Sequence, residues 1–490
     1  MAERAEAAHA VSYLRSNSHW TCLAGLAFAD VLVFTLANII FRMGRAVPTI
    51  ILAGGRPSFD GATSIDVFAL IAVVFIVFRY LSGDYSRRQL FWDNTRQSTV
   101  ALAIAALPDL FLTSLNFRVF AVANIVASWI FLIVAIPLGR QLARKLLAKA
   151  GVWYIPTALI GSSARITTIY NALARSLSLG FEVRWSVSDV CNDTAHDLPK
   201  VIRSGTMEPR EIAEQLLRAE CAQAVVATES NNSTEYTEVV RRLMEAGIAV
   251  AIVPSFQRLP LVGATTNYFF GHDVLLLQVR SNLRRFPQKL EKRVFDIVGA
   301  LSLLILFSPL FLFIATAIKR HDGGRVTYSQ KRVGQNGQTF RIIKFRTMAP
   351  DAEERLQKWR REQPELYEEY AKTFKLRDDP RITAPGKWLR KTSLDELPQL
   401  VNVLRGEMSL VGPRPVVEQE LRDYYGSAAQ LYVRVRPGLT GLWQVSGRSD
   451  TSYEERVIFD EWYVLNWSFW YDIVILIQTA GIMLTGRGAY

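Results

Sequence analysis

The sequence predicts a membrane protein of mixed α and α/β class: a four-helix transmembrane bundle, a small α/β module, and a basic third domain. Three observations carry this prediction. Four apolar stretches open the chain, strand and helix patterns alternate in the middle, and an uncharged apolar stretch leads into a basic C-terminal region. We place the three domains at residues 1–148, 149–283 and 284–490.

The composition excludes several classes of protein. Half of the 490 residues are hydrophobic and 21% are charged, which excludes a disordered chain and is too apolar for an ordinary soluble enzyme. The three cysteines and five histidines show no spacing typical of a disulfide framework or a zinc site. Any metal chemistry should therefore use oxygen ligands and a hard cation. The net charge of +12 indicates an anionic partner.

The four apolar stretches are each long enough, or nearly so, to cross about 30 Å of hydrocarbon as a helix. They are Trp20–Phe41, Ile65–Leu81, Val100–Leu115 and Phe117–Leu138. Basic residues follow the second and fourth stretches, which places those connections on the cytoplasmic face. A tight hairpin is expected at Asn116. Asp30 and Asp109 lie inside apolar stretches, where a carboxylate either lines an ion path or forms hydrogen bonds between helices.

Residues 150–280 alternate between strand and helix patterns, which predicts a small doubly wound α/β module. A strand at Thr157–Ile160 leads into Gly161 and then a helix, the place where such folds bind a phosphate. Only one glycine stands where the dinucleotide-binding motif has three. We interpret the module as a degenerate Rossmann-like domain with a structural or regulatory role, and a working dinucleotide site is the alternative.

The uncharged stretch Ile297–Ile318 has basic residues at both ends. A crossing helix would put the basic third domain on the opposite side from the α/β module, which the positive-inside rule opposes. Ser308 and Pro309 stand at its centre; proline kinks a helix, and a nearby serine can satisfy the freed carbonyl. We predict a re-entrant helix over residues 292–320 that returns to the same face. The alternative is a fifth span with a kink.

Next, Asn336-Gly337 predicts a tight hairpin, and alternation along its second strand puts Lys344 and Arg346 on one face. Further on, Asp395 and Glu396 are adjacent carboxylates. Ser393 and Glu396 have the spacing of a capping box, which predicts a helix N-terminus. Unpaired N–H groups in that first turn would keep an aspartate ionised.

Further cations accompany this carboxylate pair. They are Arg381, Arg390, Arg414 in a rigid Gly412–Pro415 turn, and Arg448 in a glycine-rich loop. A carboxylate nucleophile, a second carboxylate for a hard cation, and arginines for phosphoryl oxygens together suit phosphoryl transfer.

Residues 285–490 closely resemble the bacterial sugar transferases, the monotopic polyprenyl-phosphate phosphoglycosyl transferases. The matching segments are Lys344–Met348, Ser393–Gln399, Gly412–Pro415, Arg436–Gly441 and Gly488–Tyr490. The bundle and the α/β module are similar to those of long-form members, so the resemblance covers nearly the whole chain.

The resemblance implies transfer of hexose-1-phosphate, from glucose or galactose, out of a UDP-sugar onto undecaprenyl phosphate, with release of UMP. It implies that Asp395 is the nucleophile of a covalent phosphosugar intermediate and that Glu396, with Asp395, binds Mg²⁺. Substrate-binding roles would fall to Lys344, Arg346, Arg381, Arg390, Arg414 and Arg448.

The resemblance also implies a location and a pathway. The catalytic domain would lie on the cytoplasmic face of the bacterial inner membrane, in contact with lipid, and would start exopolysaccharide, capsule or O-antigen synthesis. A homodimer is expected, and a nucleic acid partner is not.

Two other classes of function compete with this interpretation. One is a membrane sensor whose α/β module binds a nucleotide, but two adjacent carboxylates among cations argue for an enzyme. The other is a transporter, for which isolated Asp30 and Asp109 supply no substrate path. Within the enzyme class, an N-acetylated amino sugar stays open beside glucose and galactose.

Overall fold

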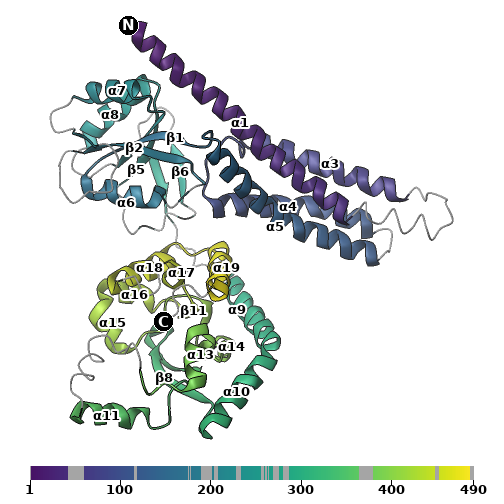
Figure 1. The fold of residues 1–490 in the computed structure, drawn as a ribbon, viewed down its shortest axis with the longest axis vertical. Coiled ribbons are helices and arrows are strands. Elements are labelled where there is room, and N and C mark those ends of the chain that lie inside the picture. Colours follow the sequence, from purple (N-terminus) through teal and green to yellow (C-terminus); the bar gives the residue numbers. More distant parts are fainter. Residues whose placement is uncertain are drawn as a thin grey trace. The chain divides into compact units, whose positions relative to one another are not determined.

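The chain forms two compact units, Met1–Ser255 and Phe256–Tyr490, with mixed α and β content (Figure 1). The structure is a computed structural model, and it describes residues 2–41, 60–114, 119–174, 176, 178–188, 201–203, 208–227, 233–254, 259, 262, 264–268, 275–279, 286–362, 379–446 and 452–485. The three-domain division at 1–148, 149–283 and 284–490 stays a prediction. Asn116 and its hairpin lie outside the described residues.

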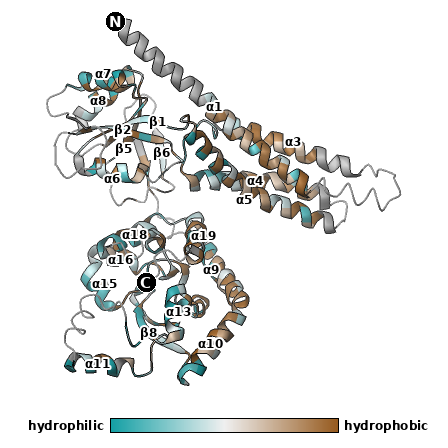
Figure 2. Ribbon diagram, in the orientation of Figure 1, coloured by the Kyte–Doolittle hydropathy of each residue, from teal (hydrophilic) through white to brown (hydrophobic). Residues whose placement is uncertain are grey.

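Four helices of the first unit pack around one apolar core. They are α1 (Ala2–Phe41), α3 (Asp60–Leu81), α4 (Phe91–Ser114) and α5 (Val119–Lys149). Each contributes a large buried side chain: Phe34, Phe68, Leu102 and Leu132. Hydrophobic residues dominate the parts of these helices that Figure 2 colours by hydropathy. Two segments, Trp20–Phe41 and Val122–Lys149, are long and apolar enough to cross a membrane, whereas the apolar part of α3 is shorter. Four spans remain a prediction.

Both carboxylates inside these apolar helices are held by neighbouring side chains. Asp30 pairs with Arg140 of α5 and accepts a hydrogen bond from the Tyr85 hydroxyl at 2.8 Å. Asp109 accepts one from the indole N–H of Trp129, also at 2.8 Å. Buried polar groups are stable when they are paired in this way. These contacts favour hydrogen bonding between helices over an ion path.

A five-stranded parallel sheet follows the helices, in the order β3-β2-β1-β4-β5. Its strands are β1 (Ile155–Ile160), β2 (Phe181–Ser188), β3 (Val201–Arg203), β4 (Gln223–Ala227) and β5 (Ala249–Val253), with helices α6 (Ser163–Ala174), α7 (Pro209–Arg218) and α8 (Ser233–Glu245). Gly161 directly follows β1 with φ +154°, and a Cβ there would lie 2.9 Å from the Cβ of Ala227. Close packing between strands therefore explains this glycine without a bound phosphate.

The second unit combines a bent apolar helix pair, short strands and many short helices. It begins with β6 (Thr265–Tyr268), β7 (Leu275–Gln278), α9 (Phe286–Leu306), α10 (Ser308–Asp322), β8 (Thr327–Val333), η3 (Gln335–Gly337), β9 (Thr339–Phe345) and α11 (Ala352–Glu362). It continues with α13 (Ala384–Thr392), η4 (Leu394–Glu396), α14 (Gln399–Arg405), β10 (Ser409–Val411), α15 (Glu418–Tyr424), η5 (Gly426–Ala428), α16 (Ala429–Tyr432), β11 (Gly438–Thr440), α17 (Leu442–Ser446), α18 (Tyr453–Leu465) and α19 (Phe469–Thr485). Their shared core includes Ala300, Leu400, Leu410 and Trp467.

The hairpin between β8 and β9 turns where the sequence predicted. Asn336 and Gly337 both have positive φ, +58° and +74°, and the Gln338 N–H donates to the Gln335 carbonyl at 3.2 Å. Two central residues with positive φ define the type I′ turn, whose twist matches that of paired strands. The predicted position of the turn is confirmed, but the loop has three residues, Gln335–Gly337, because the Gly334 N–H donates to the Gln338 carbonyl at 2.8 Å. The resulting register carries Lys344 to the end of β9.

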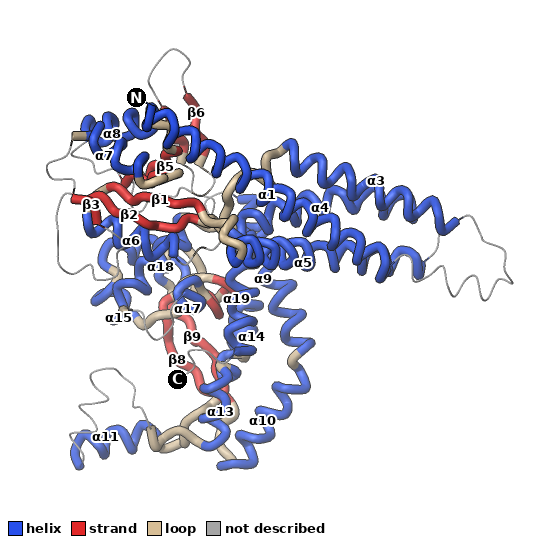
Figure 3. Tube along the Cα trace, turned by 45° about the horizontal axis from the view of Figure 1, so that its top comes forward, coloured by secondary structure: helices blue, strands red, loops and turns tan. Residues whose placement is uncertain are grey.

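The apolar pair α9–α10 bends by 61° at Phe307 (Figure 3). Pro309 has no N–H, so the carbonyl of Ile305 loses the hydrogen bond that a straight helix would give it. The Ser308 hydroxyl donates to that carbonyl instead, at 2.8 Å. The serine–proline pair thus stabilises the bend locally. A re-entrant path through a membrane would need such a bend and stays a prediction.

We predict that Pro309→Ala straightens the helix pair, because the restored N–H can donate to the Ile305 carbonyl. Spin labels at the exposed positions Leu301 and Leu312 report the change, in a chain without its three native cysteines. The label separation should increase toward the roughly 17 Å axial spacing of a straight helix. Ser308→Ala, which keeps the proline, is the control and should retain the bend. An unchanged separation in Pro309→Ala would contradict the role assigned to the proline.

Candidate active site

Asp395 and Glu396 lie side by side in η4, a single 3₁₀ turn between α13 and α14. Ser393 has φ +56°, an uncommon conformation for a residue other than glycine. It forms the C-cap of α13, and its side chain makes no capping hydrogen bond toward η4. The predicted capping box is therefore wrong. The left-handed Ser393 turns the chain sharply, and a short 3₁₀ turn carries the carboxylates where an α-helix was expected.

Lys344 near the end of β9 contacts this turn. Its Nζ donates to Glu396 Oε1 at 2.6 Å, and both side chains are about one-third exposed. Buried Asn402 of α14 fixes the geometry: it accepts from the Ile343 N–H at 3.1 Å and donates to the Arg341 carbonyl at 2.8 Å. The amide thus ties α14 to β9, which holds the carboxylate turn beside the lysine.

The surroundings raise the pKa of Asp395 to about 6. Burial is the largest cause, and the negative charge of Glu396 adds to it; the cations Lys344 and Arg390 oppose it. At neutral pH the Asp395 carboxylate is therefore ionised but poorly solvated. A poorly solvated anion among cations is suited to attack an electrophile or to bind a cation.

Arg390 is the second cation whose charge acts on Asp395. Its Nε donates to Thr347 Oγ1 at 3.0 Å; burial lowers the pKa of Arg390, and the charge of Asp395 opposes that shift. Arg381 is close enough to influence Arg390, but it forms a buried ion pair with Asp379 at 2.7 Å. Arg390 is therefore the arginine whose charge acts on Asp395, whereas Arg381 is paired with Asp379.

Arg346 contacts a different carboxylate from the one that Lys344 contacts. Its guanidinium pairs with Asp322 at the end of α10, with one contact of 2.7 Å, and donates to the Arg325 carbonyl at 2.5 Å. This contact lowers the pKa of Asp322 to about 2. Lys344 faces the carboxylate turn, whereas Arg346 fastens the strand to the helix pair. The structure does not bring these two predicted cations to one partner.

Arg414 belongs to a second group of side chains. Its guanidinium lies 5.4 Å from the centre of the Trp443 ring, and that of Arg456 lies 5.0 Å from the same ring. Asp460, fully buried nearby, has its pKa raised to about 7 by burial. This group could receive an aromatic or anionic part of a ligand. Arg448, predicted to belong to the site, lies outside the described residues.

The carboxylate pair suits a divalent cation with oxygen preference. Mg²⁺ binds proteins through one or two carboxylates and completes its shell with water and substrate phosphates. In the described part of the chain, no group of three or more His, Cys, Asp or Glu side chains could enclose a metal. The negative charges of Asp395 and Glu396 repel each other, so a cation beside them would stabilise both. The two residues therefore fit a Mg²⁺ that is also bound by substrate phosphates.

Comparison with known proteins shows the family of this chain. Residues 287–486 match the family described as bacterial sugar transferase. Undecaprenyl-phosphate galactose phosphotransferase of Salmonella typhimurium is 37% identical over 473 residues, 96% of this chain and 98% of that protein. The chain belongs to the bacterial sugar transferase family.

Two further relatives show how the similarity is distributed over this family member. UDP-galactose-lipid carrier transferase of Erwinia amylovora is 36% identical over 468 residues, 95% of this chain and 97% of that protein. Exopolysaccharide production protein ExoY of Rhizobium meliloti is 55% identical over 199 residues, 41% of this chain and 88% of that protein. The greater identity falls on a shorter relative, consistent with the family match to the C-terminal part.

The structure of this sugar transferase adds three residues that sequence reasoning missed. Thr347 accepts from Arg390, Asn402 joins α14 to β9, and Asp322 pairs with Arg346. Thr347 lies within Lys344–Met348, a segment that resembles the family, so the sequence could have indicated a role for it in the site. Asn402 and Asp322 are single polar residues in or at the end of helices, and only their tertiary contacts reveal them.

We predict that Asp395→Asn stabilises the transferase at pH 8. Ionising Asp395 is unfavourable in the fold, since its pKa is about 6 there against a usual 3.8, and an amide has no charge to desolvate. The melting temperature of the variant should exceed that of the unchanged protein at pH 8. The difference in melting temperature should shrink as the pH falls from 6. It should vanish below about 4, where the Asp395 side chain is neutral in both the folded and the unfolded protein.

Asp423→Asn makes the same chemical change at an exposed position and serves as the control, with little effect expected. A pH-independent difference for Asp395→Asn, or a lower melting temperature at pH 8, would contradict the assigned pKa.

Proposed function

We propose that this chain transfers hexose-1-phosphate from a UDP-sugar to undecaprenyl phosphate through a covalent intermediate on Asp395. The observation that carries the proposal is the adjacent pair Asp395–Glu396, with Lys344 bonded to Glu396 and Arg390 beside Asp395. A partly desolvated carboxylate next to two cations has what a nucleophile toward phosphorus needs.

The reaction proceeds in two displacements. A carboxylate oxygen of Asp395 attacks the phosphorus that carries the sugar; the new O–P bond forms as the bond to UMP breaks, and UMP leaves with the electron pair. An oxygen of undecaprenyl phosphate then attacks the same phosphorus and releases the carboxylate. The covalent route avoids direct attack of one phosphate anion on another. Lys344 and Arg390 stabilise the charge that develops on the phosphoryl oxygens.

Asp395 and Glu396 would hold Mg²⁺ together with the diphosphate of the sugar donor. When bound, the cation supplies positive charge to the phosphoryl oxygens. Lys344 orients Glu396 through the 2.6 Å contact, and Arg390 with Thr347 positions the arginine plane next to Asp395. Arg414, through the group around Trp443, and Arg448 complete the proposed substrate-binding set. Arg346 and Arg381 support it through their ion pairs with Asp322 and Asp379.

Galactose is the sugar that the names of the two full-length relatives support, with glucose as the alternative. The product lipid would start exopolysaccharide, capsule or O-antigen synthesis, and the name of the ExoY relative supports an exopolysaccharide role. Transfer onto a membrane lipid also requires the site to lie at a membrane surface.

We place the chain in the bacterial inner membrane with its catalytic domain on the cytoplasmic face. Two long apolar helices and the bent pair α9–α10 support attachment to a membrane. In this arrangement α1, α3, α4 and α5 form a four-span bundle, α9–α10 is re-entrant, and the parallel sheet is a Rossmann-like module without a working dinucleotide site. A homodimer is part of the proposal.

We predict that the protein releases UMP when a UDP-sugar, undecaprenyl phosphate and Mg²⁺ are present. A panel of UDP-glucose, UDP-galactose and UDP-N-acetyl sugars identifies the donor. Asp395→Asn should abolish release, because an amide cannot form the intermediate, whereas Asp423→Asn should leave it unchanged. Normal release in Asp395→Asn would refute the nucleophile, and no release from any donor would favour a sensor or scaffold.

We predict that Glu396→Gln weakens the dependence on Mg²⁺. Loss of one carboxylate should shift the Mg²⁺ titration of UMP release to at least about tenfold higher concentration, in line with the loss of a metal ligand. Glu418→Gln makes the same change at an exposed position of α15 and is the matched control. An unchanged titration in Glu396→Gln would count against its role as a metal ligand.

A further inference from the structure

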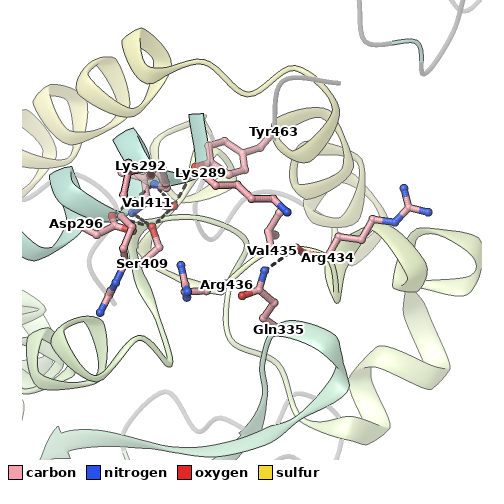
Figure 4. A pocket seen from close by; sticks show the side chains of 12 residues that line it. Lys289, Lys292, Asp296, Gln335, Ser409, Val411, Arg434, Val435, Arg436 and Tyr463 are labelled. Atoms are coloured by element: carbon pink, nitrogen blue, oxygen red, sulfur yellow. Dashed lines mark hydrogen bonds and ion pairs between the residues drawn. The ribbon is translucent and has the colours of Figure 1, made fainter. Parts of the chain in front are cut away.

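The described residues of the second unit include two groups of cations away from the carboxylate turn. The first surrounds a cavity of about 410 Å³ at the start of α9, where Figure 4 shows Lys292 beside Asp296. Lys292 also pairs with Asp472 at 2.6 Å. Arg293 and Arg436 donate to backbone carbonyls. These three cations are therefore used within the fold.

The second group surrounds Trp443 of α17, and its arginines have no such partners. The guanidinium of Arg414 lies 5.4 Å from the centre of the Trp443 ring, and that of Arg456 lies 5.0 Å from it. Among the described residues, neither guanidinium forms an ion pair or a hydrogen bond, and Nε of Arg456 is buried without an acceptor. Two like charges beside one ring repel each other and their donors need acceptors, so a ligand rich in acceptors would stabilise the pair.

Two carboxylates near this group already have other partners. The charges of Glu420 and Asp460 act on the Tyr453 hydroxyl together with those of the two arginines. Glu420 accepts from the Val417 N–H at 3.0 Å, at the start of α15. Buried Asp460 accepts from the Tyr425 hydroxyl at 2.8 Å. Neither carboxylate forms an ion pair with the two arginines in the part of the chain that the structure describes, which leaves both guanidiniums to a ligand.

The group around Trp443 lies at the turn end of the β8–β9 hairpin. At this end, the Val333 N–H donates at 2.9 Å to the carbonyl of Val416, two residues after Arg414. At the other end, about 17 Å along the strand, Lys344 contacts the carboxylate turn. A ligand that reaches both places must therefore be long, with its reacting atom at one end and another part near Trp443.

The proposed sugar donor has this shape. In a UDP-sugar the phosphorus that carries the sugar is attacked, and the uridine extends away from it through the second phosphate and the ribose. The phosphate of the lipid acceptor must itself reach the attacked phosphorus, so it belongs beside Asp395. Uracil presents two carbonyl oxygens as acceptors, and guanidinium groups carry donors only. The base therefore matches the exposed Arg414 and the half-buried Arg456.

We infer that Arg414 and Arg456, held beside the ring of Trp443, bind the uracil base of the sugar donor and so select a uridine nucleotide. The inference rests on the proposed function, and it adds Arg456 as a specificity-determining residue. Cytosine carries an amino group in place of one carbonyl, and an amino group that faces guanidinium donors leaves both without an acceptor. A cytidine nucleotide should therefore bind less tightly than the uridine nucleotide.

The test measures binding of UMP, CMP and ribose 5-phosphate to the full-length chain in detergent, by ligand-observed NMR titration. All three probes are phosphate monoesters, and ribose 5-phosphate lacks the base. UMP should bind at least about tenfold more tightly than CMP. Arg456→Gln should weaken UMP binding about tenfold and leave ribose 5-phosphate binding unchanged. Arg422→Gln makes the same change at an exposed arginine of α15 and is the matched control, with normal UMP binding expected.

Arg414→Gln, at an exposed side chain, covers the case in which Arg456→Gln misfolds, and should weaken UMP binding in the same selective way. Equal affinity for UMP and CMP, or unchanged UMP binding in either folded variant, would overturn the inference. An equal loss of UMP and ribose 5-phosphate binding would also overturn it, because that result assigns the arginines to a phosphate of the donor or of the lipid. The titration involves no sugar transfer, so its failure is separate from a failure of UMP release.

Discussion

The chemistry of this protein depends on keeping two neighbouring carboxylates charged in a partly buried turn. Burial penalises the charge of Asp395 and the neighbouring charge of Glu396 repels it, which is why the pKa of Asp395 is raised to about 6. The ion pair between Lys344 and Glu396 offsets part of that penalty. β9 brings Lys344 to the turn, and α13 brings Arg390 close to Asp395.

That geometry rests on polar contacts between elements far apart in the chain. Asn402 ties α14 to β9 through two backbone hydrogen bonds, and Arg346 ties the end of β9 to α10 through Asp322. Lys292 ties α9 to α19 through Asp472. The bent apolar pair, the hairpin and the carboxylate turn are thereby parts of one framework. The proposed transfer to a lipid phosphate at the membrane surface requires the apolar pair α9–α10 and the carboxylate turn to keep fixed positions relative to each other.

Charge in this framework is distributed unevenly. At the carboxylate turn, cations and anions are matched, so the site is prepared for a substrate that brings its own phosphates and a metal. At the first turns of α9, Lys292 lies between the buried carboxylates Asp296 and Asp472. Arg293 and Arg436 donate instead to backbone carbonyls of the segment at the end of α14.

The sequence alone determined those features that depend on short stretches of chain. Asn336-Gly337 fixed a type I′ turn because only a few residues tolerate two positive φ values, and Ser308-Pro309 marked the helix break because proline removes a backbone donor. The adjacency of Asp395 and Glu396, with the motifs around them, was equally local and gave the family.

Tertiary structure decided which charges meet. Capping-box spacing at Ser393 predicted a helix N-terminus, but the left-handed Ser393 and the packing of α13 produced a 3₁₀ turn. Alternation put Lys344 and Arg346 on one face, yet Glu396 and Asp322 drew them to different partners. A partner's position depends on contacts between residues 24 to 52 positions apart in these two pairs, and no local pattern encodes such contacts.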